Sequence, residues 1–388
     1  MSAAPPPGNA GSGGSAPVRV VIVDDSAVQR RFARSALEAD GQMTVVGEAR
    51  NGRDAVAMVD RLQPEAVLMD LHLPVMNGIE AIERIMATRP TPILVYSAFV
   101  DGEDRDNAAA ALAAGAVDVM AKPGPRDSGH LDEYAEALRK RLRVAGRAKV
   151  ITHPRGRLGG ANVTLSTRRL GGGSAAPQIP PPPPQSEVLD GLRRRKVRVI
   201  GIGASTGGPQ ALATVLGELP EDLEAAVVVV QHMADGFIEG LAHWLDGLCA
   251  LPVSVASAGR RLAPGTVSIA PSGVNLIVHD SLRVTAAEPP TTQYHVPGID
   301  ETLSSIASAV GQYAVGVLLT GMGRDGALGL KRMRERGALT IAQDEATSAV
   351  YGMPAAAVAI GAAELQLPIG EIGPALRQVA ASVREATP

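Results

Sequence analysis

The chain has very little cysteine, no long apolar run and almost no net charge, and each shortage excludes a class of protein. A single cysteine, Cys249, cannot form an internal disulfide, so we expect a protein of a reducing, cytoplasmic compartment. Cys249 lies in an apolar stretch and is interpreted as core filling rather than as a reactive thiol. No run approaches the ~20 apolar residues of a membrane helix, and the N-terminus lacks the apolar core of an export sequence, so no membrane insertion is expected.

The charge balance gives no reason to expect a nucleic-acid partner. The chain carries 37 Lys and Arg against 40 Asp and Glu, a net charge of -3. One basic run, residues 193–196, is present without a recognition helix or an aromatic platform beside it. We therefore interpret this run as the solvated start of a strand and predict no nucleic-acid binding.

Composition divides the chain into four parts. Residues 1–17 consist almost entirely of Gly, Ser, Ala and Pro and predict a disordered tail. Residues 146–196 are rich in Pro and Gly and include five consecutive prolines, which is typical of a linker. The remaining parts, 18–145 and 197–388, alternate apolar strands with helical patterns. The sequence therefore predicts an α/β protein of two doubly wound domains with mainly parallel sheets.

Polar side chains follow the predicted strands of the first domain. These strands cover 20–23, 43–48, 66–69, 93–96 and 116–121. The polar residues at their carboxyl ends are Asp24, Asp25, Asp70, Ser97 and Lys122. Because these ends meet at one edge of a parallel sheet, we expect the side chains to cluster there. Crowded carboxylates favour Mg²⁺, and with a lysine and a hydroxyl they are suited to a phosphoryl group.

Residues 18–145 resemble the receiver domain of bacterial two-component response regulators, which has a flavodoxin-like fold. The resemblance rests on the strand-end residues just named. It implies that Asp70 accepts a phosphoryl group from a histidine kinase and that Ser97 and Lys122 contact it. It also implies a Mg²⁺ ion held by Asp24, Asp25 and Asp70.

A glycine-rich turn opens the second domain. The sequence 201–208 reads Gly-Ile-Gly-Ala-Ser-Thr-Gly-Gly, between an apolar strand at 197–202 and a helix beginning near Pro209. Ser205 is therefore expected where a strand turns into a helix, close to unpaired N–H groups. A serine in that position is either a nucleophile or part of a phosphate cradle.

Two further buried strands, at 225–230 and near 314–319, lead to His232 and Asp325. Serine, histidine and aspartate at neighbouring strand ends provide a nucleophile, a base and an orienting carboxylate. Each residue alone also has an ordinary structural interpretation, as a cap, a buried histidine or a turn former. A dinucleotide-binding fold is a further alternative, but it requires an acidic residue where this chain has Gln231 and His232.

Over residues 18 to about 380 the chain resembles the protein-glutamate methylesterase/glutamine deamidase family of bacterial chemotaxis, the CheB family. The motifs are Gly-Ala-Ser-Thr-Gly-Gly, Gln-His-Met and Thr-Gly-Met-Gly-x-Asp-Gly, together with the receiver. The resemblance implies a Rossmann-like methylesterase domain without a cofactor that hydrolyses glutamyl methyl esters, and deamidates glutamines, on chemoreceptors. It implies a triad of Ser205, His232 and Asp325, with the backbone N–H groups of Thr206 and Met322 as the oxyanion hole.

The chain departs from this family pattern at two places. The family commonly reads His-Arg-Pro-Ser-Val-Asp where this chain has Val296 and Gly298 in place of the arginine and the serine. The family also has a histidine after Ala-Pro-Gly, whereas here the corresponding segment leads to Asn275. An arginine and a histidine are thus absent near the expected substrate groove. The resemblance further implies that the unphosphorylated receiver covers the hydrolase site.

Overall fold

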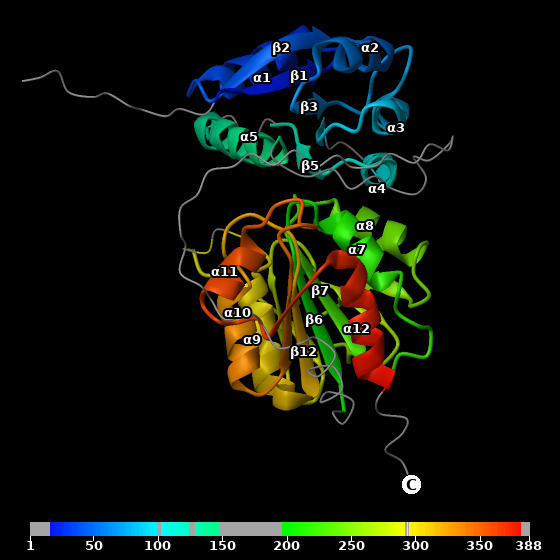
Figure 1. The fold of residues 1–388 in the computed structure, drawn as a ribbon, viewed down its shortest axis with the longest axis vertical. Helices are drawn as coiled ribbons and strands as arrows, with labels where there is room; N and C mark the ends of the chain where they lie inside the picture. Colours follow the sequence, from blue (N-terminus) through cyan, green and yellow to red (C-terminus); the bar gives the residue numbers. More distant parts are fainter. Residues whose placement is uncertain are drawn as a thin grey trace, which may run out of the picture.

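The computed structural model describes residues 16–98, 102–123, 129–146, 196–291, 293 and 295–381. The predicted tail and linker fall almost entirely outside these residues, and the four predicted boundaries stay predictions. Within the described part of the chain, two separate parallel sheets are each flanked by helices (Figure 1). The predicted fold class is therefore confirmed.

The N-terminal domain is built on a five-stranded sheet of order β2-β1-β3-β4-β5. Every neighbouring pair in this sheet is parallel. The strands are β1 (Val18–Val23), β2 (Met43–Ala49), β3 (Ala66–Met69), β4 (Ile93–Ser97) and β5 (Asp118–Ala121). The helices are α1 (Ala27–Glu38), α2 (Gly52–Leu62), α3 (Gly78–Thr88), α4 (Gly102–Ala114) and α5 (Leu131–Ala145).

The local sequence explains these elements. The strands are continuous apolar runs because helices cover both faces of the sheet, and every residue of β3 and β4 is buried. The side chains of Ser26, Asn51 and Asn77 accept hydrogen bonds from the backbone in the first turns of α1, α2 and α3. A turn and a capped helix start therefore follow β1, β2 and β3.

The C-terminal domain is built on a seven-stranded sheet of order β14-β13-β12-β6-β7-β9-β8, again parallel throughout. Its strands are β6 (Val199–Ala204), β7 (Ala226–Gln231), β8 (Val253–Val255), β9 (Val267–Ile269), β12 (Ala314–Leu318), β13 (Leu339–Gln343) and β14 (Leu365–Leu367). An antiparallel pair, β10 (Asn275–Val278) and β11 (Val284–Ala287), lies apart from it. The helices are α7 (Gly208–Leu216), α8 (Ile238–Asp246), α9 (Ile299–Val310), α10 (Ala327–Glu335), α11 (Met353–Ala359) and α12 (Ile369–Ala381), with a short 3₁₀ turn at Gly311–Tyr313.

The N-terminal domain sits over the carboxyl ends of the C-terminal strands, with α4, β5 and α5 toward the second domain (Figure 1). Helix α4 packs on α7 and α8. The N–H of Gly207 donates to the carbonyl of Val117 at 3.2 Å. The side-chain amide of Gln210 donates to the carbonyls of Leu112 and Ala116, at 2.5 and 2.9 Å.

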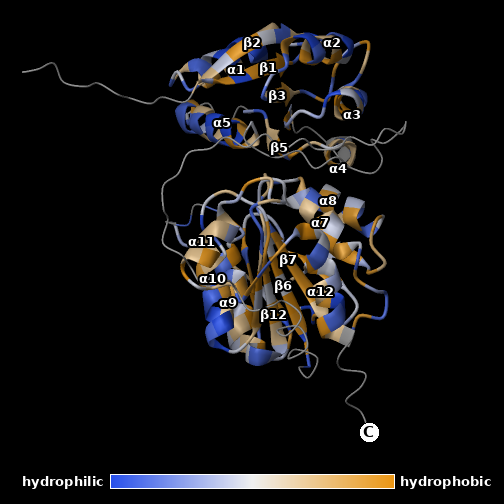
Figure 2. Ribbon diagram, in the orientation of Figure 1, coloured by the Kyte–Doolittle hydropathy of each residue, from blue (hydrophilic) through white to orange (hydrophobic). Residues whose placement is uncertain are grey.

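Apolar side chains form the interior of both domains and continue between them. One cluster of buried residues includes members from the strands of each sheet. Helices α1 and α5 of the N-terminal domain are, in contrast, largely hydrophilic (Figure 2). None of the helices that the structure describes has the length and apolar character needed to cross a bilayer.

Candidate functional site

The acidic residues of the N-terminal domain gather where the strand order reverses, between β1 and β3. Asp24 and Asp25 follow β1, and Asp70 follows β3. One carboxylate oxygen from each lies within 4.8 Å of the others. The ammonium of Lys122 lies 2.7 Å from Asp24 Oδ2 and 2.6 Å from Asp70 Oδ2. The structure thus brings these four predicted residues together.

Burial and the neighbouring charges shift the pKa values of Asp24 and Lys122 in this cluster. Burial raises the pKa of Asp24, an effect that the hydrogen bond from Lys122 only partly offsets. Burial lowers the pKa of Lys122, but the hydrogen bonds to Asp24 and Asp70 outweigh it and raise that pKa above its usual value. A buried carboxylate that is costly to ionise is the environment in which a bound cation is most favourable.

The donor set fits Mg²⁺. All the candidate ligands are hard carboxylate oxygens, and exposed Asp25 leaves one side open to water, which Mg²⁺ retains. Ser97 lies at the end of β4, and its carbonyl accepts from the N–H of Lys122 at 2.8 Å. The buried hydroxyl of Ser97 has no hydrogen-bond partner among the described residues. The pocket therefore holds an unused donor beside its carboxylates and lysine.

Three adjacent strands of the C-terminal sheet deliver the other predicted residues. Ala204 pairs with Gln231 across β6 and β7, and the N–H of His232 donates to the carbonyl of Ala204 at 3.0 Å. Ser205 and His232 therefore leave neighbouring strands side by side. Asp325 follows β12, which lies on the other side of β6, so the residues meet at the point where the strand order reverses.

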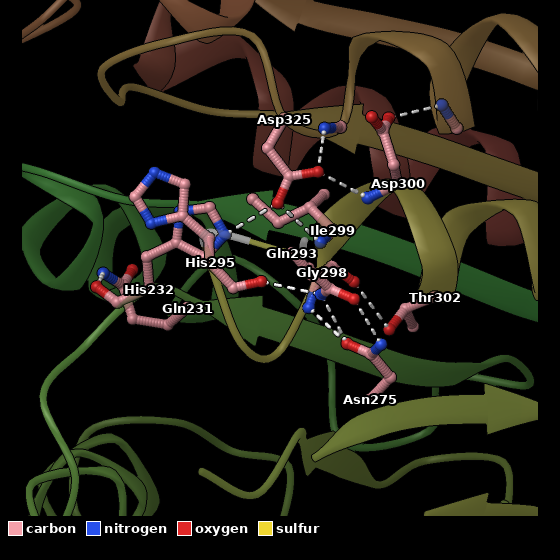
Figure 3. A network of polar contacts seen from close by, with 12 residues as sticks. Gln231, His232, Asn275, Gln293, His295, Gly298, Ile299, Asp300, Thr302 and Asp325 are labelled. Carbon is pink, nitrogen blue, oxygen red and sulfur yellow. Dashed lines mark hydrogen bonds and ion pairs between the residues drawn. The ribbon is translucent and has the colours of Figure 1, made fainter. Parts of the chain in front are cut away.

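Asp325 holds His232 through one ring nitrogen. Nε2 of His232 lies 2.9 Å from Asp325 Oδ2 (Figure 3). The same carboxylate accepts from the N–H groups of Ile299, Asp300 and Gly326, each at 2.9 Å. Although burial raises the pKa of Asp325, the hydrogen bonds from His232 and the backbone hold it below its usual value.

This arrangement fixes the tautomer of the imidazole. An ionised carboxylate only accepts hydrogen bonds, so Nε2 of His232 carries the proton. Nδ1 is then the basic nitrogen of the neutral ring. It is buried and has no hydrogen-bond partner within the described part of the chain. The ring consequently presents one available base, on the nitrogen that Asp325 does not use.

The glycine-rich turn orients two peptide groups beside Ser205. The side-chain amide of Gln231 donates to the carbonyl of Ser205 at 2.9 Å, and the hydroxyl of Thr320 donates to the carbonyl of Thr206 at 3.0 Å. No hydrogen bond among the described residues uses the N–H of Thr206 or of Met322. Both groups are therefore available as donors.

Glycine is required at two positions of this turn. Gly207 has a φ of 74°, in the left-handed region, and is the N-cap residue that precedes α7. A Cβ on Gly208 would lie 2.0 Å from Oε1 of Gln231, so a larger residue would displace the amide that holds Ser205.

Sequence reasoning did not identify several neighbours of the site. His295 stacks on His232, and Gln231 and Thr320 orient the turn. The Gln-His-Met and Thr-Gly-Met motifs contain the last two, but without an indication of what they bond. Asn275, noted as a departure from the family pattern, is buried in a hydrogen-bond network instead of lining an open groove.

The fold and the two strand-end sites are those of a receiver joined to a serine-hydrolase-like α/β domain. The response regulator receiver domain family model matches residues 20–131, and the CheB methylesterase model matches residues 200–376. The chain belongs to the CheB methylesterase family, since a relative that is well above 30% identical is covered over nearly its whole length.

That relative is protein-glutamate methylesterase/protein-glutamine glutaminase 3 of Paramagnetospirillum magneticum, 39% identical over 371 residues, 96% of this chain and 98% of the relative. A protein of Anaeromyxobacter dehalogenans with the same activity in its name is 42% identical, over 95% of this chain and 98% of its own length. The crystal structure of the Thermotoga maritima CheB methylesterase catalytic domain is 34% identical with a TM-score of 0.46, covering 47% of this chain and 99% of that one.

Proposed function

We propose that this chain is a phosphorylation-regulated serine hydrolase that removes methyl groups from glutamyl methyl esters on chemoreceptors and deamidates glutamines there. The observation that carries the proposal is the His232–Asp325 hydrogen bond, with Ser205 on the neighbouring strand end. The names of the relatives supply the substrate class.

In the first half of the reaction, Oγ of Ser205 attacks the side-chain carbonyl carbon of the ester or amide. Nδ1 of His232 takes the hydroxyl proton, because Asp325 occupies Nε2. The oxygen of the tetrahedral intermediate accepts hydrogen bonds from the N–H groups of Thr206 and Met322. His232 then protonates the leaving methoxide or amine, and methanol or ammonia departs from an acyl-enzyme on Ser205.

In the second half, water attacks the acyl carbon and His232 takes a proton from it. When the Ser205–acyl bond breaks, the proton passes to Ser205 Oγ and a glutamate carboxylate is released. The bond between Asp325 and Nε2 persists through both halves and stabilises the imidazolium that forms in each. Among the protein groups, only Ser205 and His232 change protonation state, while Asp325 stays ionised and the two N–H groups only donate hydrogen bonds.

The control element in this proposal is the receiver. Its partner is a histidine kinase that supplies a phosphoryl group to Asp70. Asp24, Asp25 and Asp70 would hold a Mg²⁺ ion, which would supply positive charge beside the phosphoryl oxygens. The ammonium of Lys122 and the hydroxyl of Ser97 then turn to the new anion. Both enzyme and kinase act in the cytoplasm in this account.

The interface gives this control a physical basis. The carbonyl of Val117 accepts from Gly207, two residues from Ser205. Buried Asp118, paired with Arg141 at 3.4 Å, also interacts electrostatically with His232 across the interface. In this proposal, a receptor helix reaches Ser205 only after the receiver moves away from the glycine-rich turn. Rearrangement around Lys122, which follows β5, favours this movement.

Release of methanol from receptor-containing membranes tests the proposal. With the phosphorylated full chain, Ser205→Ala should lower the rate by several orders of magnitude, since the nucleophile is lost. Ser308→Ala, at an exposed position of α9, is the matched control and should keep wild-type activity. Equal activity of the wild type and Ser205→Ala would contradict the hydrolase and favour a phosphorylation-controlled interaction protein.

A further inference from the structure

A second histidine lies flat against the catalytic imidazole. The rings of His295 and His232 are 4.4 Å apart between centroids, with an angle of 14° between their planes (Figure 3). His295 belongs to the segment that leads into α9, whereas His232 follows β7. None of the proton transfers in the proposed reaction involves His295.

An amide pair fixes the segment that carries His295. Nδ2 of Asn275 donates to Oε1 of Gln293 at 2.8 Å, and Nε2 of Gln293 donates back to Oδ1 of Asn275 at 2.9 Å. The same Nε2 donates to the backbone carbonyl of His295 at 2.7 Å, and Oδ1 of Asn275 accepts from the N–H of Gly298 at 2.7 Å. The amide pair thus holds the backbone at the carbonyl of His295 and again at Gly298.

Two of the departures from the family pattern belong to this amide pair. Asn275 is 3% exposed and supplies one of its two side chains. At Gly298 a Cβ would lie 2.5 Å from Nε2 of Gln293 and 3.3 Å from Oδ1 of Asn275. A serine at position 298 would therefore displace Gln293, so Gly298 and Asn275 are explained together by the amide pair.

Burial and the surrounding charges disfavour a proton on His295. Burial, followed by the charge of His232, lowers the pKa of His295 to about 4, although Asp325 acts in the opposite direction. Lys140 and Arg141 of the receiver also face this ring and disfavour its protonation. Asp118 of the receiver interacts electrostatically with His232. The stack therefore brings an uncharged ring against the catalytic base.

With only one hydrogen bond to its ring from the described residues, the imidazole of His232 can still rotate. The bond to Asp325 fixes Nε2, but the ring can still pivot about that contact and change the direction in which Nδ1 points. A flat surface pressed on one face of the ring prevents the pivot. Such restriction matters because misplacing a reacting group by 1 Å costs about a hundredfold in rate.

We propose that His295 is a positioning residue for catalysis: its ring, held by the Asn275–Gln293 amide pair, keeps His232 oriented with Nδ1 toward Ser205. The role rests on the proposed function, because it concerns the same histidine. It makes this chain's Asn275, Gln293 and Gly298 a supporting set for the catalytic base.

Steady-state kinetics of methanol release from methylated receptor membranes test this role. The full chain is used with Mg²⁺ and acetyl phosphate as phosphodonor. His295→Ala should lower kcat by about 10- to 100-fold while KM changes by less than about threefold, since the ring positions a reacting group. His295→Phe restores a flat face and should stay within about threefold of the wild type.

Gly298→Ala tests the amide pair without touching either ring. It should lower kcat in the same direction as His295→Ala, because the new Cβ displaces Gln293. Gly370→Ala is the matched control, since nothing lies within 4 Å of a Cβ at that position. Thermal unfolding of each variant shows whether it has folded.

A ¹⁵N spectrum of the imidazole rings separates positioning from a general loss of structure. In the wild type, the shifts of His232 should indicate a proton on Nε2 and none on Nδ1. In His295→Ala these shifts should move toward averaged values, while those of His243 and His279, which lie elsewhere in the domain, stay unchanged. Folded His295→Ala with wild-type kcat, or with reduced kcat and unmoved His232 shifts, overturns the proposal.

A parallel assay of Ser205→Ala distinguishes this outcome from failure of the proposed function. If Ser205→Ala is as active as the wild type, the hydrolase itself is wrong. If activity depends on Ser205 but His295→Ala and Gly298→Ala are both unaffected, only the positioning role is overturned.

Discussion

The two sheets of this molecule place polar residues by the same rule but fill the resulting crevices differently. In the receiver, the reversal of strand order collects carboxylates and a lysine that already pair with one another. In the hydrolase domain, the corresponding point collects Ser205, His232 and Asp325, and a directional hydrogen bond joins His232 to Asp325. The receiver crevice is thus organised by attraction between opposite charges, whereas the hydrolase crevice depends on the direction of a hydrogen bond.

This difference separates a switch from a catalyst. Charges that balance among themselves rearrange when a cation or a phosphoryl group enters, so the receiver site is responsive. The hydrolase site depends on fixed directions. Contacts from neighbouring segments hold the ring of His232, the turn at Ser205 and the loop at Ile299. Changes in the hydrolase site should therefore alter the chemical step, and changes in the receiver should alter only its control.

The largest effect should follow Asp325→Asn. The new amide would donate to Nε2 of His232, move the ring proton to Nδ1 and remove the base, lowering kcat roughly a thousandfold or more. Methanol release measures this loss. Asp246→Asn, a carboxylate that accepts from the backbone of Val253, is the control and should stay near wild type. A loss below about tenfold for Asp325→Asn would show that Asp325 does not set the tautomer.

Removing the receiver should have the next largest effect. A fragment beginning near Arg193 lacks the contacts over Gly207 and Gln210 and should hydrolyse faster than the unphosphorylated full chain. Domain coupling of this kind typically gives about 5- to 150-fold. Initial rates of methanol release measure it. A slower fragment would mean that the receiver supports activity, contrary to the occlusion described here.

Asp70→Asn should separate control from chemistry. The full chain with this change should lose activation by acetyl phosphate, a loss of about 5- to 150-fold under activating conditions. Its basal rate should remain that of the unphosphorylated wild type, because Asp70 lies outside the hydrolase site. Asp54→Asn, at the exposed start of α2, is the control and should still be activated. Activation that persists in Asp70→Asn would place the phosphoacceptor elsewhere.

Gln210→Ala should give the smallest effect. It removes two hydrogen bonds to the receiver, each worth about 1 kcal/mol, so basal activity should rise about 5- to 30-fold. Thr214→Ala, one turn further along α7, serves as the comparison and should leave the basal rate unchanged. An unchanged rate in Gln210→Ala would mean that the apolar contacts alone hold the domains together.

Strand periodicity and the strand-end rule were sufficient to locate most of both sites from the sequence. Buried apolar runs ending in a polar residue placed Asp70, Lys122, Ser205 and His232 correctly, because position at a strand end follows from the chain alone. The roles assigned to them stay predictions.

Contacts between segments distant in sequence could not be found in this way. The stack of His295 on His232 and the Asn275–Gln293 pair depend on how irregular loops pack, for which no periodicity exists. The strand predicted at 116–121 begins instead at Asp118. The carbonyls of Ala116 and Val117, just before it, bond Gln210 and Gly207 of the other domain, an interaction that no local pattern encodes.

The position of β12 beside β6 has a consequence for synthesis on the ribosome. Ser205 and His232 emerge on consecutive strands, but Asp325 follows His232 by roughly 90 residues, a delay of about 5 to 20 seconds at ordinary elongation rates. The receiver is translated before all three and folds first. A nascent chain therefore has a folded receiver before its triad is complete. A newly made molecule is consequently inhibited from the moment its hydrolase domain folds.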